Sequence, residues 1–292
     1  MKKIRKEEII TKSYHVPPHM VGNGFRVRQY VPGRQNLQER FSPFILLDYN
    51  EPFHFPPSDK VKGVGPHPHK GFETVTINLA GKIEHNDNKG NHGILEPGDV
   101  QWMTAGKGIL HKEYHEKEFS RTGGLFHMIQ LWVNLPREYK NTEPKYQNLL
   151  KDGMGVREMK NAKVTVIAGK AFETEGPAET FTPMNIYSVD LDKNSSIDID
   201  EPEEFNTGLI VVGGELKING TLYTENDFII FENNEGVIEL ETLSENSKII
   251  VLSGKPINEP IVSYGPFVMN TQEEITQAFE DFKNGKFGDT DF

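Results

Sequence analysis

The sequence predicts an all-β protein of antiparallel strands, arranged as barrels or sandwiches, with a short α-helix near the end of the chain. Three observations predict this class. Short apolar or β-branched segments recur along the 292 residues, and turn-forming residues separate them. In addition, only one segment near the end has helical periodicity.

The first half of the chain contains the clearest strand signals. Positions 73–79 contain β-branched residues at the density typical of a strand, and positions 126–135 alternate between apolar and polar side chains. Turn clusters at 86–90 and 96–99 interrupt the pattern. We therefore expect strands at 21–30, 44–47, 73–79, 100–103 and 126–135.

A polar segment bounded by prolines, residues 136–144, has the composition of a linker. Strand signals resume after it, so the chain is expected to form two domains, 1–137 and 138–292. The strands expected in the second half lie at 164–168, 185–191, 209–212, 213–218, 228–231 and 248–252.

The helix is predicted at residues 271–284. Thr271 and Glu274 have the spacing of a capping box, in which each side chain accepts a hydrogen bond from a free backbone amide. An apolar stripe with helical spacing follows, and Gly285 is suited to the residue after the last turn. The stripe consists of Ile275, Ala278, Phe279 and Phe282.

Composition excludes several classes of function. The formal charge of -11 disfavours direct binding of nucleic acid. The absence of cysteine excludes disulfides, zinc–thiolate sites, iron–sulfur clusters and cysteine catalysis. No apolar run reaches 18 residues, and the N-terminus has no apolar core of a signal peptide, so we expect a cytoplasmic protein that does not enter a membrane.

Histidine placement indicates a metal site. All ten histidines lie at or before His127. His67 and His69 are two residues apart, as are His111 and Glu113, and on extended strands such pairs point to the same side. Two such strands facing each other could direct three imidazoles and a carboxylate at one point. This donor set suits a redox-capable first-row metal.

The remaining candidates are weaker. If residues 67–73 were extended, Glu73 would share the face of His67 and His69. His127 is expected in the core or next to the metal ligands. His115 would share the face of His111 on an extended strand, but a surface position is expected for it. Solvent exposure is expected for His54, His85 and His92.

The pattern His67-x-His69-x-x-x-Glu73 resembles the first motif of the cupin superfamily, and Gly81 follows at about the expected spacing. A narrower resemblance is to the pirin family. It is carried by residues 66–75, by the long block 97–113, and by 130–135 and 265–271, so it extends over most of the chain.

This resemblance implies a bicupin fold, with two cupin-type antiparallel β-barrels and a short C-terminal α-helix. Residues 1–137 would be the metal-binding domain, and residues 138–292, including the helix at 271–284, a cupin domain without metal. Carried over by motif, the metal ligands would be His67, His69, His111 and Glu113. Ordinary cupins instead take their carboxylate ligand from the first motif, here Glu73, whereas pirins take it from the second. The close match of the second block favours Glu113.

The resemblance also implies an activity of the quercetin 2,3-dioxygenase type. The substrates would be a flavonol-like molecule and O2, with Glu113 as the catalytic base. Fe(II) is the expected cofactor, although Mn, Ni, Co, Cu and Zn can occupy similar ligand sets. Two alternatives remain open. The chain could be a metal- and redox-dependent regulatory protein that binds a protein partner without turnover, or a metal-stabilised barrel whose ligand is unrelated to flavonols.

Overall fold

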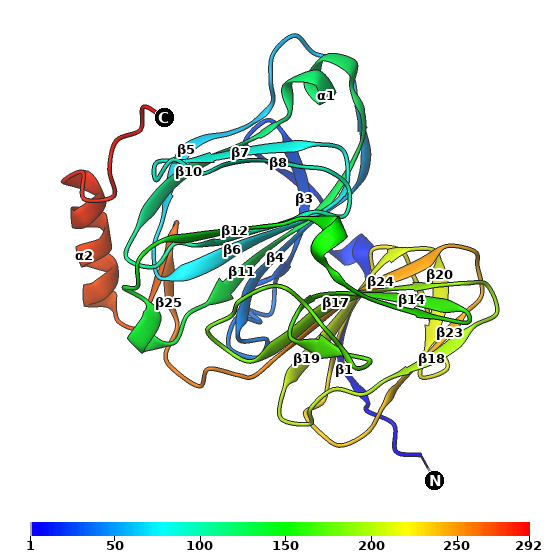
Figure 1. Cartoon of the computed structure of the whole chain (residues 1–292). Helices are drawn as coiled ribbons and strands as arrows, with labels where there is room; N and C mark the ends of the chain where they lie inside the picture. The colour runs from blue at the N-terminus through cyan, green and yellow to red at the C-terminus, as the bar shows by residue number, and fades with distance from the viewer. Residues whose placement is uncertain (1) are drawn as a thin grey trace. The chain divides into compact units, whose positions relative to one another are not determined.

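The computed structural model describes residues 2–292 and consists mainly of antiparallel strands (Figure 1). It contains two compact units. The first, which we call the N-terminal unit, consists of Pro18–Glu39, Pro43–Lys151 and Ile257–Phe292. The second, which we call the C-terminal unit, consists of the residues up to Pro17, Arg40–Ser42 and Asp152–Pro256. Each unit combines one seven-stranded and one four-stranded sheet. The predicted all-β architecture is confirmed, with open sandwiches in place of closed barrels.

The N-terminal unit has its two main sheets in separate layers (Figure 1). In spatial order, the large sheet contains β12 (Lys145–Leu149), β9 (Val100–Thr104), β6 (Phe72–Ala80), β11 (Gly124–Asn134), β4 (Phe44–Phe55), β3 (Phe25–Val31) and β2 (His19–Val21). The small sheet contains β5 (Gly63–His69), β10 (Ile109–His115), β7 (Ile83–Asp87) and β8 (His92–Leu95).

Apolar side chains from both sheets fill the space between these layers. The cluster consists of Phe25, Val27, Phe55, Ile83, Leu95, Phe126 and Met128. They come from β3, β4 and β11 on one side and from β7 and β8 on the other. Because alternate residues of a strand point to opposite faces, each of these strands contributes one face to the core.

The C-terminal unit repeats this architecture. Its large sheet contains β1 (Glu7–Thr11), β22 (Phe228–Phe231), β19 (Asn206–Gly213), β24 (Ser247–Gly254), β17 (Met184–Leu191), β14 (Ala162–Ala168) and β13 (Gly155–Met159). Its small sheet contains β18 (Ser196–Ile199), β23 (Ile238–Thr242), β20 (Glu215–Ile218) and β21 (Thr221–Thr224). The rest of this unit includes the short pair β15 (Lys170–Ala171) and β16 (Thr174–Glu175) and the 3-10 turn η1 (Ser13–His15).

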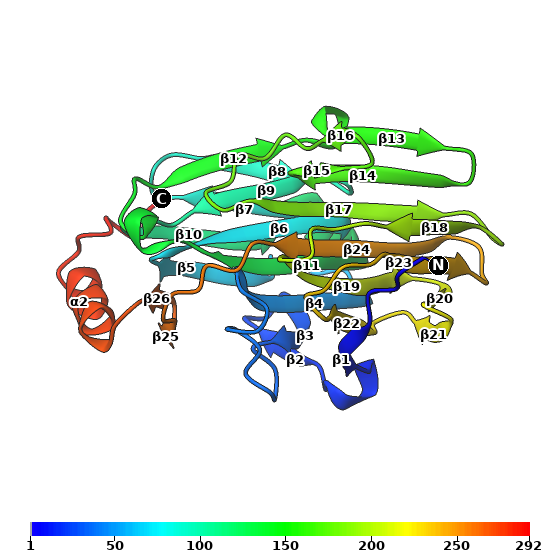
Figure 2. The same cartoon turned by 90° about the horizontal axis from the view of Figure 1, so that it is seen from below.

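The compact units differ from the predicted domains 1–137 and 138–292 at both ends of the chain. Strand β1 pairs with β22 and so belongs to the C-terminal unit. The last residues belong to the N-terminal unit, where β25 (Val262–Tyr264) and β26 (Phe267–Met269) precede α2 (Gln272–Lys283), as Figure 2 shows. The free edge of β22 pairs with β1, and the apolar face of α2 packs on the N-terminal unit. The composition of the linker does not specify either contact.

Helix α2 matches the prediction closely. Thr271 is the N-cap, and the reciprocal bonds of the capping box with Glu274 are both formed. Ile275 and Ala278 are buried against Leu110 and Phe287. Phe279 and Phe282, the other half of the predicted stripe, stay 37% exposed. Both rings still contact the buried Phe267 ring, with centroid distances of 4.8 Å and 6.4 Å, so the stripe is a packing face with a partly exposed edge.

The remaining elements of the N-terminal unit are short. They are the helix α1 (Lys117–Thr122) and the 3-10 turn η2 (Arg137–Tyr139), and a further 3-10 turn, η3 (Lys151–Gly153), spans the boundary between the units. In the part of the chain that the structure describes, no helix combines the length and apolarity needed to cross a bilayer.

Candidate metal centre

Strands β5 and β10 place the predicted ligands side by side. They are neighbours in the small sheet, and His67 is the register partner of His111. His69 and Glu113 each lie two residues from one of these histidines, so all four side chains share one face. Neighbouring strands of one sheet thus achieve what the sequence analysis expected of two facing strands. Strand β5 contains Pro66 and Pro68 and is an edge strand, where missing amide donors are tolerated.

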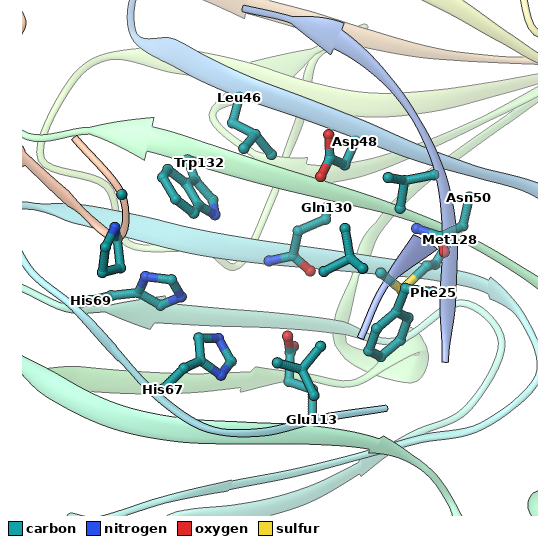
Figure 3. Close-up of a pocket in the computed structure, with 15 residues that line it drawn as sticks. Phe25, Leu46, Asp48, Asn50, His67, His69, Glu113, Met128, Gln130 and Trp132 are labelled. Carbon is teal, nitrogen blue, oxygen red and sulfur yellow. The ribbon is translucent and has the colours of Figure 1, made fainter. Parts of the chain in front are cut away.

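The three imidazoles lie close enough to share one ion. The ring centroid of His67 is 4.8 Å from that of His69 and 4.3 Å from that of His111, and the His69 and His111 centroids are 4.8 Å apart. One nitrogen of each lies within 4.8 Å of the others. His69 and His111 are buried, whereas His67 is half-buried and lines a pocket (Figure 3).

The hydrogen bonds and charge states of these rings fit a metal ion. The Nδ1 atom of His67 lies 2.8 Å from the Gly65 carbonyl oxygen. When Nδ1 carries the proton and donates it to this oxygen, the lone pair of the neutral ring is on Nε2, where it can bind a metal ion. The Nε2 atom of His111 is buried without a hydrogen-bond partner among the described residues. Burial lowers the pKa of His69 and His111 well below the ordinary value, so both rings are neutral, as metal ligands must be. This cluster could hold a metal ion.

Glu113 is tied to the opposite sheet. The hydroxyl of Thr76 on β6 lies 3.2 Å from the Glu113 Oε1 atom and 2.8 Å from the Gln130 Oε1 atom. A single hydroxyl proton can serve either oxygen in turn. Thr76 therefore orients the carboxylate and places it beside Gln130 on the inner face of the sandwich.

Glu73 lies on the other face of β6. Thr76 faces Glu113, so the pleat directs residues 74, 76 and 78 inward and residue 73 away from the histidines. The extended path that would have joined Glu73 to His67 and His69 is broken at Gly71, whose φ is +86°. Thr104 donates a 2.7 Å hydrogen bond to Glu73, and burial raises the Glu73 pKa to about 7. Of the two carboxylates that the sequence left open, only Glu113 faces the cluster.

His85 is a member of the site that the sequence analysis missed. It was expected to be exposed, but it lies on β7 with 0% exposure. Its Nδ1 atom is 2.9 Å from Gln101 Nε2 and 3.4 Å from His111 Nδ1. His85, His111 and Glu113 also form a group able to hold a metal. The segment Ile83–Asp87 has one apolar residue, so the sequence carried no strand signal there, and the burial of His85 follows from the pairing of β7 with β10.

The other histidines lie outside the cluster. His115 was expected at the surface, but it is buried 4.6 Å, centroid to centroid, from both Phe55 and Phe126. His127 is buried as expected, with its Nε2 atom 2.8 Å from the Tyr49 hydroxyl. His54 and His92 are exposed as expected.

A pocket of about 320 Å³ adjoins the cluster (Figure 3). His67, His69 and Glu113 line it on one side, and β4 and β11 supply the facing side. Most of its surface is apolar. The lining residues are Val21, Phe25, Val27, Leu46, Asp48, Asn50, Val64, His67, His69, Glu113, Met128, Gln130, Trp132, Gly265 and Pro266. This volume lies within the range of sites for small organic ligands.

Comparison with known protein families gives two matches. A family model described as "Pirin" matches residues 24–133, and one described as "Pirin C-terminal cupin domain" matches residues 186–288. A crystal structure titled quercetin 2,3-dioxygenase from Acinetobacter baumannii aligns with a TM-score of 0.91 and 41% identity, covering 98% of this chain and 99% of that chain. The predicted bicupin fold is confirmed.

Two curated relatives give the same result. A Pseudomonas aeruginosa protein named "Putative quercetin 2,3-dioxygenase" is 43% identical over 272 residues, covering 92% of this chain and 94% of its own. The protein named Pirin from Mus musculus is 34% identical over 280 residues, covering 91% of this chain and 89% of its own.

Proposed function

Because this chain belongs to the pirin family, we propose that it is a mononuclear metal protein that cleaves flavonols with O2 in the manner of quercetin 2,3-dioxygenases. One observation carries the proposal. Three imidazoles and the Glu113 carboxylate share a face of two neighbouring strands, beside an apolar pocket of small-molecule size.

In this proposal His67, His69, His111 and Glu113 hold one divalent ion, and Fe(II) is the expected one. Mn, Ni, Co, Cu and Zn suit similar ligand sets. The bound ion supplies Lewis acidity and redox chemistry toward O2. The neutral state of His69 and His111 supports this assignment, because a protonated imidazole cannot donate a lone pair.

The chain's own residues prepare the substrate. Glu113 lines the pocket and accepts the proton of the flavonol 3-hydroxyl. The Thr76 hydroxyl orients the Glu113 carboxylate by donating a hydrogen bond to its Oε1 atom. The apolar lining, which includes Trp132 and Leu46, fits flat aromatic rings and excludes water from them. Ring cleavage would then consume O2 and release carbon monoxide.

The test combines elemental analysis of the purified protein with O2 uptake on a panel of flavonols. The wild-type chain is expected to contain one metal ion per chain and to consume O2 only when a flavonol is present. His111→Ala is expected to reduce metal content and O2 uptake to background. His92→Ala is the matched control, because His92 is exposed on β8 and lies outside the cluster.

Two results would contradict the proposal. Full O2 uptake by the metal-stripped protein would exclude a metal-dependent reaction. A metal-loaded protein that never consumes O2 with any flavonol would exclude the flavonol dioxygenase and leave the metal-dependent binding protein as the second candidate, beside a metal-stabilised barrel with an unrelated ligand. Capture of a protein partner that depends on the oxidation state of the metal would then test that second candidate.

A further inference from the structure

The pocket side opposite the histidines contains three polar side chains, Asp48, Asn50 and Gln130, which we call the polar row. Asp48 on β4 is the register partner of Gln130 on β11, and Asn50 lies two residues beyond Asp48, opposite Met128. All three line the pocket among apolar side chains. Figure 3 shows Asn50 at the side of the pocket away from His69, with Gln130 between them.

Asn50 has no structural partner. Its side chain is 1% exposed, and neither Nδ2 nor Oδ1 makes a hydrogen bond with any described residue. By contrast, the amide nitrogen of buried Asn78 in the same unit donates to the carbonyl oxygens of Gly81 and Leu95. Burying an amide without partners is unfavourable, and the fold gains nothing from this one. A partner from outside the chain would explain its presence at the pocket.

The two other members of the row also have unused hydrogen-bonding capacity. Gln29 donates a 3.1 Å hydrogen bond to Asp48 Oδ1, and burial raises the Asp48 pKa to about 7, so its second oxygen carries a proton in much of the population near neutral pH. The Gln130 Oε1 atom accepts from Thr76, whereas its Nε2 atom has no hydrogen-bond partner among the described residues. The row therefore offers both donors and acceptors to a ligand.

The charge of the lining restricts the ligand further. No lysine or arginine lines the pocket, so it offers no partner for a carboxylate or phosphate away from the histidines. Phe25 and Trp132 provide apolar surface on the same lining. A hydroxyl group both donates and accepts one hydrogen bond without charge, so neutral aromatic hydroxyls match this surface.

We propose that the polar row selects polyhydroxylated aromatic ligands by binding the hydroxyl groups of the ring that lies away from the metal ligands. This rests on the proposed function, because the flavonol 3-hydroxyl is taken to lie at Glu113. Asn50 would be a specificity residue that contacts the substrate without taking part in the bond-breaking steps.

The test uses two flavonols that differ only at this ring. Quercetin has two hydroxyl groups there, and galangin has none. Binding to the full-length, metal-loaded chain is followed by quenching of tryptophan fluorescence, since Trp132 lines the pocket. Wild type is expected to prefer quercetin. Asn50→Leu is expected to raise the Kd for quercetin roughly three- to tenfold, the effect of about one hydrogen bond. The Kd for galangin is expected to stay within about twofold of the wild-type value.

Two controls separate selectivity from folding. Asn50→Leu removes an unpartnered buried amide, so its Tm without ligand is expected to equal or exceed that of wild type. Asn50→Ala is a second, smaller variant that should lose the same selectivity if the leucine does not fit. Met128→Leu, on the partner residue of Asn50, is expected to change the binding of both flavonols by the same factor.

The outcomes distinguish this inference from the proposed reaction. Selective binding that depends on Asn50, without any O2 uptake, would support the polar row and contradict the reaction. O2 uptake with unchanged selectivity in both Asn50 variants would contradict the polar row and leave the reaction standing. Absence of binding by any flavonol would overturn both.

Discussion

Glu73 and Glu113 are chemically identical side chains in different environments, because alternate residues of a strand point to opposite faces of its sheet. Glu113 faces the pocket and shares the Thr76 hydroxyl with Gln130. Glu73, on the opposite face of β6, is 1% exposed and accepts a hydrogen bond from Thr104. Desolvation penalises the charged form, which is why the Glu73 pKa rises to about 7.

This raised pKa makes stability depend on pH. Between the ordinary value of 4.5 and about 7, the folded chain retains a proton on Glu73 that the unfolded chain releases. Stability from this group is therefore full below pH 4.5 and is lost as the pH rises through 7. Glu73→Gln keeps the acceptor for Thr104 and cannot ionise. At pH 8 it is expected to increase the free energy of unfolding by up to about 3 kcal/mol, with little effect at pH 4.

Urea denaturation of both proteins at several pH values between 4 and 8 measures this difference. Glu138→Gln, the same substitution at an exposed position, serves as the control. A stability difference between wild type and Glu73→Gln that stays constant across the pH range would contradict the assignment.

At the scale of elements, the turn between β5 and β6 decides the geometry of the site. Lys70 and Gly71 carry the chain from the small sheet to the large one, immediately after His69. Gly71 has a φ of +86°, and a Cβ there would collide with the carbonyl oxygen of Val268. Only glycine adopts this positive φ without strain and also lacks the Cβ that would collide.

Gly71→Ala and Gly90→Ala form a matched pair that tests this turn. Gly90 has nearly the same φ, +87°, but no atom lies within 4 Å of a Cβ built there. Gly90→Ala is expected to cost about 1–2 kcal/mol from backbone strain alone. Gly71→Ala adds a steric clash, so its total cost is expected to reach about 3 kcal/mol or more. Equal losses of unfolding free energy in denaturant titrations would show that the close approach of Val268 is unimportant.

Helix α2 provides a second prediction at this scale. The Thr271 side chain accepts a hydrogen bond from the backbone amide of Glu274, so Thr271→Ala is expected to lower the free energy of unfolding by about 1 kcal/mol. Thr276 is exposed inside the same helix, where alanine is the better helix former. Thr276→Ala is therefore expected to be neutral or slightly stabilising. Thermal denaturation in which both variants lose the same stability would argue against the cap.

At the scale of the whole molecule, the two units share an architecture but differ in the chemistry of their interiors. In the C-terminal unit, the space between the sheets is filled by an apolar cluster that includes Val166, Leu209 and Ile249. In the N-terminal unit, the apolar cluster occupies part of that space, and the histidines and the pocket occupy another part. A fully packed core contributes to the free energy of unfolding, whereas a pocket buries less apolar surface and leaves room for a ligand.

Metal binding should return part of this stability. If the cluster binds an ion only in the folded state, a free concentration of 100 times Kd stabilises the protein by about 2.7 kcal/mol. Adding Fe(II) under anaerobic conditions to metal-free wild type is therefore expected to raise Tm. No rise is expected for His111→Ala, and the normal rise is expected for His92→Ala. A rise of equal size in His111→Ala would place the binding site elsewhere.

The candidate ligands were predictable because their signal is local. Two-residue spacing places His67 with His69 and His111 with Glu113 on any extended strand, and the apolar stripe and the Thr271 cap fix α2 in the same way. Most strands of the two large sheets were predictable for the same reason, although their ends were not. Strand β4 continues from the expected residue 47 to Phe55.

The sequence alone thus determined most strands of the two large sheets, where α2 begins, and which half of the chain contains the histidines. It did not predict strands such as β7, β8 and β23 of the small sheets. The tertiary structure decided which sheet each strand joins, and with it the burial of His85 beside His111, the inward face of Glu113 rather than Glu73, and the position of Asn50 at the pocket. It also decided that β1 and α2 join units distant from them in the chain. The reason is physical: strand register and packing depend on contacts between residues far apart in sequence, which local propensity and spacing do not specify.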